Sequence, residues 1–323
     1  MILPDQMEGF REGLALYYPQ RLLAKILVKA LKKFAVLRGF LKTDVFDFVS
    51  SGPVESLLRE NKADMKGLLL GNPSQKERRG LLLYSDQKGA KMVAKIGTTP
   101  EARRKISREA SLLVALNEAD HPFPAVPPII AVWDEEGWNA FTLGFYEVNP
   151  ASSISRSEVV QVLSGWASDE KNLNLQTSQS WADVSRKLTE DELEISAQLK
   201  LRSSLRHGDF APWNILETSS NEPMVIDWEF GRLEDVPGWD LVHFLILEAS
   251  LIDRRAPRET LESTLRLLET DEQLREFLKF TGWVGHEKLL VKSYLLIMGD
   301  QLVQFSPFLN GPVLSNGARY HNE

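Results

Sequence analysis

Hydrophobic and polar positions in the first half of the chain form short runs that predict strands. Residues 66–70 and 80–84 are apolar runs joined by the polar segment 71–79. Residues 90–96 alternate, so Val93 and Lys95 share one face of a strand while apolar residues occupy the other. Residues 127–133 and 139–145 predict a further hairpin with its turn at 134–137.

A helix is predicted between these strands. Pro100 lies in a plausible first helical turn, and apolar residues then recur at helical spacing as far as Asn117. Glu109 borders that apolar face.

The second half of the chain has a helical pattern. Helices are predicted over 157–166, from Thr189 to about Ser204, from Trp239, and through 258–308. Thr189 followed by Glu192 has the spacing of a capping box. The helix that begins there is expected to lead into a loop at 207–214, and 231–238 is predicted to be a loop.

Three polar residues in this half suit one chemistry. Asp209 and Asn214 lie five residues apart, and Asp227 follows a short apolar run that predicts a buried strand. Phosphoryl transfer needs a carboxylate to orient the attacking hydroxyl and oxygen ligands to hold Mg²⁺ against the phosphates. Each residue alone has a plainer interpretation as a turn or a helix cap. Their order and spacing together favour a site for a magnesium nucleotide.

The motifs His207–Asn214 and Ile226–Glu229 resemble those of the aminoglycoside phosphotransferase family, the small-molecule branch of the protein-kinase-like fold. The resemblance implies an α+β, bilobal fold with a small antiparallel-sheet N-lobe and a mainly helical C-lobe. It implies that Asp209 is the catalytic carboxylate and that Asn214 and Asp227 are metal ligands. Ala211 stands where protein kinases usually have lysine, which argues against a protein substrate.

The same resemblance assigns residues of the first half. Lys95 is expected to hold the nucleotide phosphates, Glu109 to pair with Lys95, and Val93 to cover the adenine. Backbone groups near Glu147 and Val148 are expected to bind adenine at the interlobe hinge. The alternatives are an exposed strand lysine and a surface glutamate paired with Lys105.

Three further residues are interpreted as support. The resemblance implies that Asp240 braces the backbone of the catalytic loop, and His207 is interpreted as a scaffold residue that bonds to main chain. His243 is interpreted as helical packing. The segment 71–79 departs from the glycine-rich pattern of protein kinases, so its phosphate contacts are open.

Length and motif positions predict three regions: an N-terminal extension at 1–60, an N-lobe at 61–148 and a C-lobe at 149–323. Within the extension, residues 21–42 contain seven basic and no acidic residues along an amphipathic pattern. Such a helix can contact an anionic membrane surface, but packing on the protein with its lysines in water is the favoured interpretation.

Composition limits the function classes. The chain of 323 residues is 43% hydrophobic and 26% charged, which is typical of a globular protein. It has no cysteine, so disulfides and thiolate metal sites are excluded. A net charge of −7 argues against a general nucleic-acid binder. No apolar run reaches the roughly 20 residues of a membrane span, and no signal peptide is recognised, so a cytoplasmic location is expected.

The leading hypothesis is an ATP- and Mg²⁺-dependent O-phosphotransferase that acts on a hydroxyl of a small molecule, such as an amino sugar, a sugar or an amino alcohol. The alternative is a catalytically silent nucleotide-binding module of the same fold that acts at a membrane or on a partner. Neither the acceptor nor the oligomeric state follows from the sequence.

Overall fold

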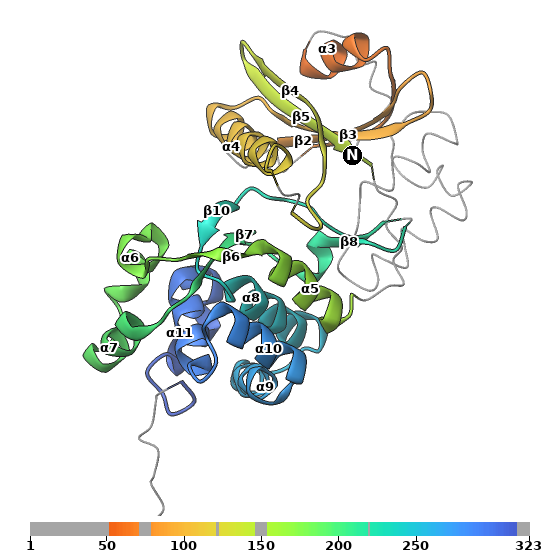
Figure 1. Ribbon diagram of the computed structural model, residues 1–323. Coiled ribbons are helices and arrows are strands. Elements are labelled where there is room, and N and C mark those ends of the chain that lie inside the picture. The colour runs from red at the N-terminus through yellow and green to blue at the C-terminus, as the bar shows by residue number, and fades with distance from the viewer. Residues whose placement is uncertain (1–51, 71–78, 121–122, 146–153, 219, 315–323) are drawn as a thin grey trace, which may run out of the picture. The chain divides into compact units, whose positions relative to one another are not determined.

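The computed structural model of the chain describes residues 52–70, 79–120, 123–145, 154–218 and 220–314 (Figure 1). The chain divides into two compact units. The sheet unit comprises Met1–Asn117 and Pro127–Glu147, and the helical unit comprises Glu118–Val126 and Val148–Glu323. The basic segment 21–42, most of 71–79, and the hinge residues Glu147 and Val148 lie outside the described residues, and the expectations for them stay predictions.

The sheet unit contains a five-stranded antiparallel sheet in the order β1-β2-β3-β5-β4. Its strands are β1 Asp64–Leu70, β2 Arg79–Ser85, β3 Lys91–Gly97, β4 Ile129–Glu135 and β5 Trp138–Gly144. The helix α4, Pro100–Asn117, contacts β3, β4 and β5. The five predicted strands and the helix of this half are present. The turn predicted at 134–137 is shorter than expected, because β4 continues to Glu135 and pairs with Trp138.

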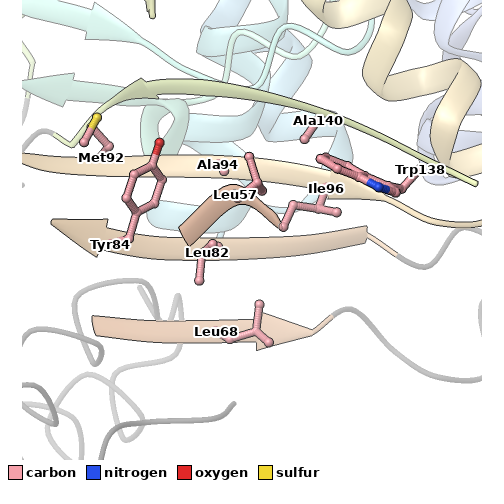
Figure 2. Close-up of a cluster of buried hydrophobic side chains, with 9 residues drawn as sticks. All are labelled: Leu57, Leu68, Leu82, Tyr84, Met92, Ala94, Ile96, Trp138 and Ala140. Carbon is pink, nitrogen blue, oxygen red and sulfur yellow. The ribbon is translucent and has the colours of Figure 1, made fainter. Parts of the chain in front are cut away.

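A second helix of the sheet unit, α3 Pro53–Glu60, packs on the apolar face of β3. Leu57 of α3 is fully buried among Met92, Ala94 and Ile96, which alternate along β3 as the sequence pattern predicts (Figure 2). Val93 and Lys95 are consequently on the opposite face of the strand. The segment just before residue 61 thus contributes to the core of the sheet unit.

The helical unit contains two small antiparallel sheets and a set of helices. A three-stranded sheet has the order β10-β7-β6, and β8 pairs with β9. The strands are β6 Ala167–Asn172, β7 Arg202–Arg206, β8 Ile215–Glu217, β9 Pro223–Val225 and β10 Arg232–Asp235. The core contains the fully buried rings of Trp166, Trp228, Trp239, Trp283, Phe210, Phe244, Tyr294 and Phe305.

Most residues of the helical unit are in helices. The α-helices are α5 Arg156–Trp166, α6 Gln179–Ser185, α7 Glu190–Gln198, α8 Trp239–Leu247, α9 Pro257–Thr270, α10 Glu272–Thr281 and α11 Glu287–Met298. Shorter helical segments are η3 Leu175–Thr177, η4 Pro212–Asn214, η5 Glu248–Ile252 and η6 Gly299–Phe308. The predicted fold class, an antiparallel sheet followed by a mainly helical part, is confirmed.

Two local predictions are wrong. The helix that begins with the Thr189–Glu192 capping box ends at Gln198, and the strand β7 leads into the catalytic loop instead. Residues 232–235, predicted to be loop, form β10. Both segments owe their strand conformation to pairing with each other across a distance of about thirty residues in sequence, and β7 pairs also with β6. A local sequence pattern does not record such pairing.

Among the described residues, none of the helices combines the length and the apolar character needed to cross a membrane.

Candidate active site

The catalytic loop, residues 207–214, is attached to α8 through its backbone. Asp240, in the first turn of α8, accepts hydrogen bonds from the N–H groups of His207 at 2.7 Å and Gly208 at 3.0 Å. A carboxylate that binds two successive backbone N–H groups fixes the path of the chain between them. The structure therefore places Asp240 where it can act as the brace that the resemblance implies.

The ring of His207 links the catalytic loop to the segment that leads to Asp227. It is completely buried, its Nε2 lies 3.0 Å from the carbonyl oxygen of Ile226, and its Nδ1 accepts from the N–H of Asp209 at 3.2 Å. A carbonyl only accepts, so Nε2 carries the proton of a neutral ring. Burial disfavours the charged ring and holds the pKa of His207 below its usual value. The nearby carboxylates act in the opposite direction but do not outweigh burial, so the ring stays neutral.

Gly208 allows the loop to turn at this point. Its φ of 84° lies in the left-handed region, and a Cβ there would be 2.7 Å from Cβ of Phe230. Both the backbone conformation and the lack of space require glycine.

The carboxylate of Asp209 is held at both of its oxygens. Nδ2 of Asn214 donates to Oδ2 and to the backbone carbonyl of Asp209, both at 2.9 Å. Nε2 of His243 lies 3.0 Å from Oδ1. The side chain of Asp209 nevertheless remains 33% exposed, so a ligand can reach it.

Asp227 lies directly after a residue that is bonded to the catalytic loop. The N–H of Ile226 donates to the carbonyl oxygen of Asn214 at 2.9 Å, while its own carbonyl binds His207. Asp227 has a φ of 70°, which is uncommon for a residue with a side chain. Such backbone strain is typical of functional sites, where the surrounding structure maintains it.

Asn214 and Asp227 fit a divalent cation. The amide of Asn214 uses its nitrogen to bind Asp209, so its oxygen is the atom suited to a metal, and Asp227 supplies carboxylate oxygens. No cluster of three or more His, Cys, Asp or Glu side chains suitable for a metal occurs in the described part of the chain. Two oxygen ligands from the protein, completed by phosphates and water, are the arrangement that Mg²⁺ commonly uses in nucleotide sites.

In the sheet unit, Lys95 and Glu109 form an ion pair. Nζ of Lys95 lies 2.6 Å from Oε1 of Glu109, and the side chains are 15% and 1% exposed. Neither residue is thus the exposed surface group that the plainer interpretation assumed. Val93 lies on the same face of β3 as Lys95 and is half-buried.

One contact of this site is not predicted by the sequence pattern. His243 was interpreted as helical packing, but its ring bonds to Asp209 and, through Nδ1, to the hydroxyl of Tyr294 at 2.9 Å. The signal was available: His243 lies three residues after Asp240, so both project from the same face of α8.

The loop therefore presents an anchored, accessible carboxylate, Asp209, held by Asn214, and the segment that leads to Asp227 is bonded to the same loop. A family model described as "Phosphotransferase enzyme family" matches residues 164–279, the segment that contains the whole catalytic loop and Asp227. Over this segment the match agrees with the resemblance carried by the motifs. No individual curated protein matches it in sequence.

Solved structures of similar fold include an aminoglycoside phosphotransferase from Alicyclobacillus acidocaldarius, at 14% identity and a TM-score of 0.40, covering 75% of this chain and 80% of that one. A putative fructosamine-3-kinase from Haemophilus somnus has 10% identity and a TM-score of 0.45, with 80% and 95% covered. A macrolide 2'-phosphotransferase from Brachybacterium faecium has 17% identity and a TM-score of 0.42, with 80% and 97% covered. Similarity at this level says nothing of the acceptor.

Proposed function

We propose that this chain is an ATP-dependent kinase that transfers the γ-phosphoryl group to a hydroxyl of a small molecule, with a divalent cation, Mg²⁺, as cofactor. The observation that carries the proposal is the carboxylate of Asp209, which is fixed at both oxygens yet one-third exposed. A carboxylate that is both fixed in orientation and accessible is suited to contact a substrate.

In the proposed reaction, Asp209 orients the acceptor hydroxyl and takes its proton as the oxygen bonds to the γ-phosphorus. The bond from that phosphorus to the β-phosphate oxygen breaks, and ADP leaves. Because the transition state is loose, proton transfer to Asp209 is late and a weak base suffices.

The remaining residues hold the nucleotide. Lys95, paired with Glu109, would bind the phosphates, and Val93 would contact the adenine. Asn214 and Asp227 would ligate the cation, which neutralises developing charge on the phosphates when bound. Backbone groups near Glu147 and Val148 remain the proposed adenine contacts, as the resemblance implies.

Several small-molecule acceptors are compatible with the proposal. Among solved structures of similar fold, one is described as an amicoumacin kinase in complex with AMP-PNP, Ca²⁺ and Ami, at 10% identity and a TM-score of 0.41. Amino sugars, sugars and amino alcohols form the first acceptor panel. Cytoplasmic location follows as part of the proposal, because a kinase needs a supply of ATP.

The test combines binding and turnover. Thermal unfolding is recorded with ATP, with and without Mg²⁺, for the wild type and for Asp227→Ala. A ligand at a hundredfold over its Kd stabilises a protein by about 2.7 kcal/mol, which raises the midpoint by several degrees. We expect a Mg²⁺-dependent shift in the wild type that Asp227→Ala loses.

Asp209→Asn is the second arm. We expect it to retain the thermal shift with Mg·ATP and to lose about 10²- to 10⁴-fold of γ-phosphate transfer, the usual contribution of a general base. Wild-type protein that shows no shift with ATP or GTP would contradict the kinase proposal. A module that binds a membrane or a partner, with the segment 21–42 as its contact region, would then be the better hypothesis.

A further inference from the structure

Three side chains of the helical unit form a continuous line of hydrogen bonds. Oδ1 of Asp209 lies 3.0 Å from Nε2 of His243, whose Nδ1 lies 2.9 Å from the hydroxyl of Tyr294. His243 is on α8 and Tyr294 on α11, and these two helices pack together. His243 and Tyr294 are 4% and 1% exposed, so only the Asp209 end of the line is accessible.

The direction of the hydrogen bonds follows from the donors available. An ionised carboxylate only accepts, so Nε2 of His243 donates to Asp209. In a neutral ring Nδ1 then accepts, and the hydroxyl of Tyr294 donates to it. Burial raises the pKa of Tyr294 well above its ordinary value, so the hydroxyl keeps its proton and remains a donor.

This line restricts a carboxylate that has two side-chain torsions of its own. Asn214 binds Oδ2 from the loop side, while His243 binds Oδ1 from α8. Contacts to both oxygens fix the plane of the carboxylate. Each carboxylate oxygen can accept more than one hydrogen bond, so an acceptor hydroxyl can still bind.

We propose that His243, itself oriented by Tyr294, is a positioning residue that fixes the direction in which Asp209 meets the acceptor hydroxyl. The inference rests on the proposed kinase function. Helix α8 would then hold Asp209 in two ways. Asp240 fixes the backbone of the loop, and His243 fixes the side chain of Asp209. Misplacing a reacting group by about 1 Å can cost on the order of a hundredfold in rate.

A purely structural role makes a different prediction. If the hydrogen bond between His243 and Tyr294 served only to pair two buried polar groups, replacing either residue would lower stability. The turnover of the folded protein would then be unchanged. The experiment must therefore separate stability, nucleotide binding and turnover.

The first arm is spectroscopic and needs no turnover. The chain has five histidines, so ¹⁵N-histidine labelling gives a short spectrum, and His243→Gln identifies the signal of His243. We expect the Nε2-protonated tautomer, with a hydrogen-bonded Nε2 proton that Asp209→Ala removes. An Nδ1-protonated ring, or a signal indifferent to Asp209→Ala, overturns the inference.

The second arm measures the release of γ-phosphate from Mg·ATP, with water as the acceptor. His243→Leu should lower kcat by about 10- to 100-fold and change the KM for ATP by less than about twofold. His243→Gln, which can donate at one end and accept at the other, should recover most of kcat. Tyr294→Phe should lower kcat by a few fold.

Tyr84→Phe is the matched control. It removes another buried hydroxyl, bonded at 3.1 Å to Thr142 in the sheet unit. Tyr84 belongs to the apolar cluster of β3, on the face opposite Val93 and Lys95. The thermal unfolding midpoint of Tyr84→Phe should fall about as much as that of Tyr294→Phe, while its kcat stays unchanged. Equal kcat in His243→Leu and the wild type overturns the positioning role alone. A wild type that neither binds nor hydrolyses Mg·ATP overturns the proposed function, and the inference with it.

Discussion

The sheet unit and the helical unit each contain a buried lysine–glutamate pair, with an Nζ–Oε1 distance of 2.6 Å in both. In the sheet unit, Lys95 on β3 pairs with Glu109 on α4. In the helical unit, Lys292 on α11 pairs with Glu192 on α7. The residue types and the Nζ–Oε1 distance are the same, but we propose a ligand-binding purpose for only the first pair.

The two pairs differ in their surroundings. Glu192 also accepts the N–H of Thr189 at 2.9 Å, so the second pair is part of the capping box that begins α7. Lys292 is 4% exposed, whereas Lys95 is 15% exposed. A buried ion pair is by itself weak evidence for function or for stability. Accessibility of the cation and its place on the sheet distinguish Lys95.

The largest expected effect comes from neutralising each pair without leaving a lone charge. Lys95→Met/Glu109→Gln should lower γ-phosphate release from Mg·ATP by about 10²- to 10³-fold, as the loss of one preorganised charged contact does elsewhere. Lys292→Met/Glu192→Gln is the control, since glutamine can keep the capping box. Its rate should stay within about threefold of the wild type.

Both double variants are assayed well below their unfolding midpoints, so that stability does not enter the rate. Equal losses of rate in the two would show that Lys95 has no special role.

The next effect is on stability. Lys292→Met alone leaves Glu192 buried without its partner, and breaking one side of a buried pair costs about 3–5 kcal/mol. Adding Glu192→Gln removes the lone charge and should restore most of the unfolding free energy, measured by chemical denaturation. If the double variant were as unstable as the single one, packing of the lysine stem would explain the loss instead.

The smallest effect is on the dependence of stability on pH. Burial tends to raise the pKa of Glu192, but hydrogen bonds from Lys292 and Thr189 outweigh it and hold the pKa below its usual value. A lowered pKa in the folded state adds stability that is present above the pKa of the unfolded chain and is lost as pH falls through the folded value.

Unfolding free energy of the wild type should therefore fall more steeply below about pH 4.5 than that of Lys292→Met/Glu192→Gln. Parallel curves for the two proteins would mean that Glu192 contributes nothing to acid stability.

Local patterns predicted much of the fold, and the reason is visible in single elements. Alternation along β3 separates Lys95 from the apolar face, and the Thr189–Glu192 spacing forms the predicted capping box. Both features can be recognised from residue types within a few positions of one another. The polar residues of the catalytic loop were likewise found together, because five residues separate Asp209 from Asn214.

Two features built from distant contacts were not predicted. The strand β7 was mistaken for the end of a helix, because its conformation depends on pairing with β6 and β10. Residues 118–126 interrupt the sheet unit in sequence yet belong to the helical unit, where Ala125 accepts a backbone bond from Val225 at 2.8 Å. No local periodicity in the sequence indicates that residues 118–126 belong to the helical unit.

The amino-acid sequence was enough to predict the sheet-then-helix order and to select the candidate site residues. These properties reside in side-chain type and short spacing. Only the tertiary structure decided how Asp209 is held, since its partner His243 lies 34 residues away and Tyr294 a further 51. Those contacts exist because α8 and α11 pack together, and helix packing is set by the whole core rather than by any one segment.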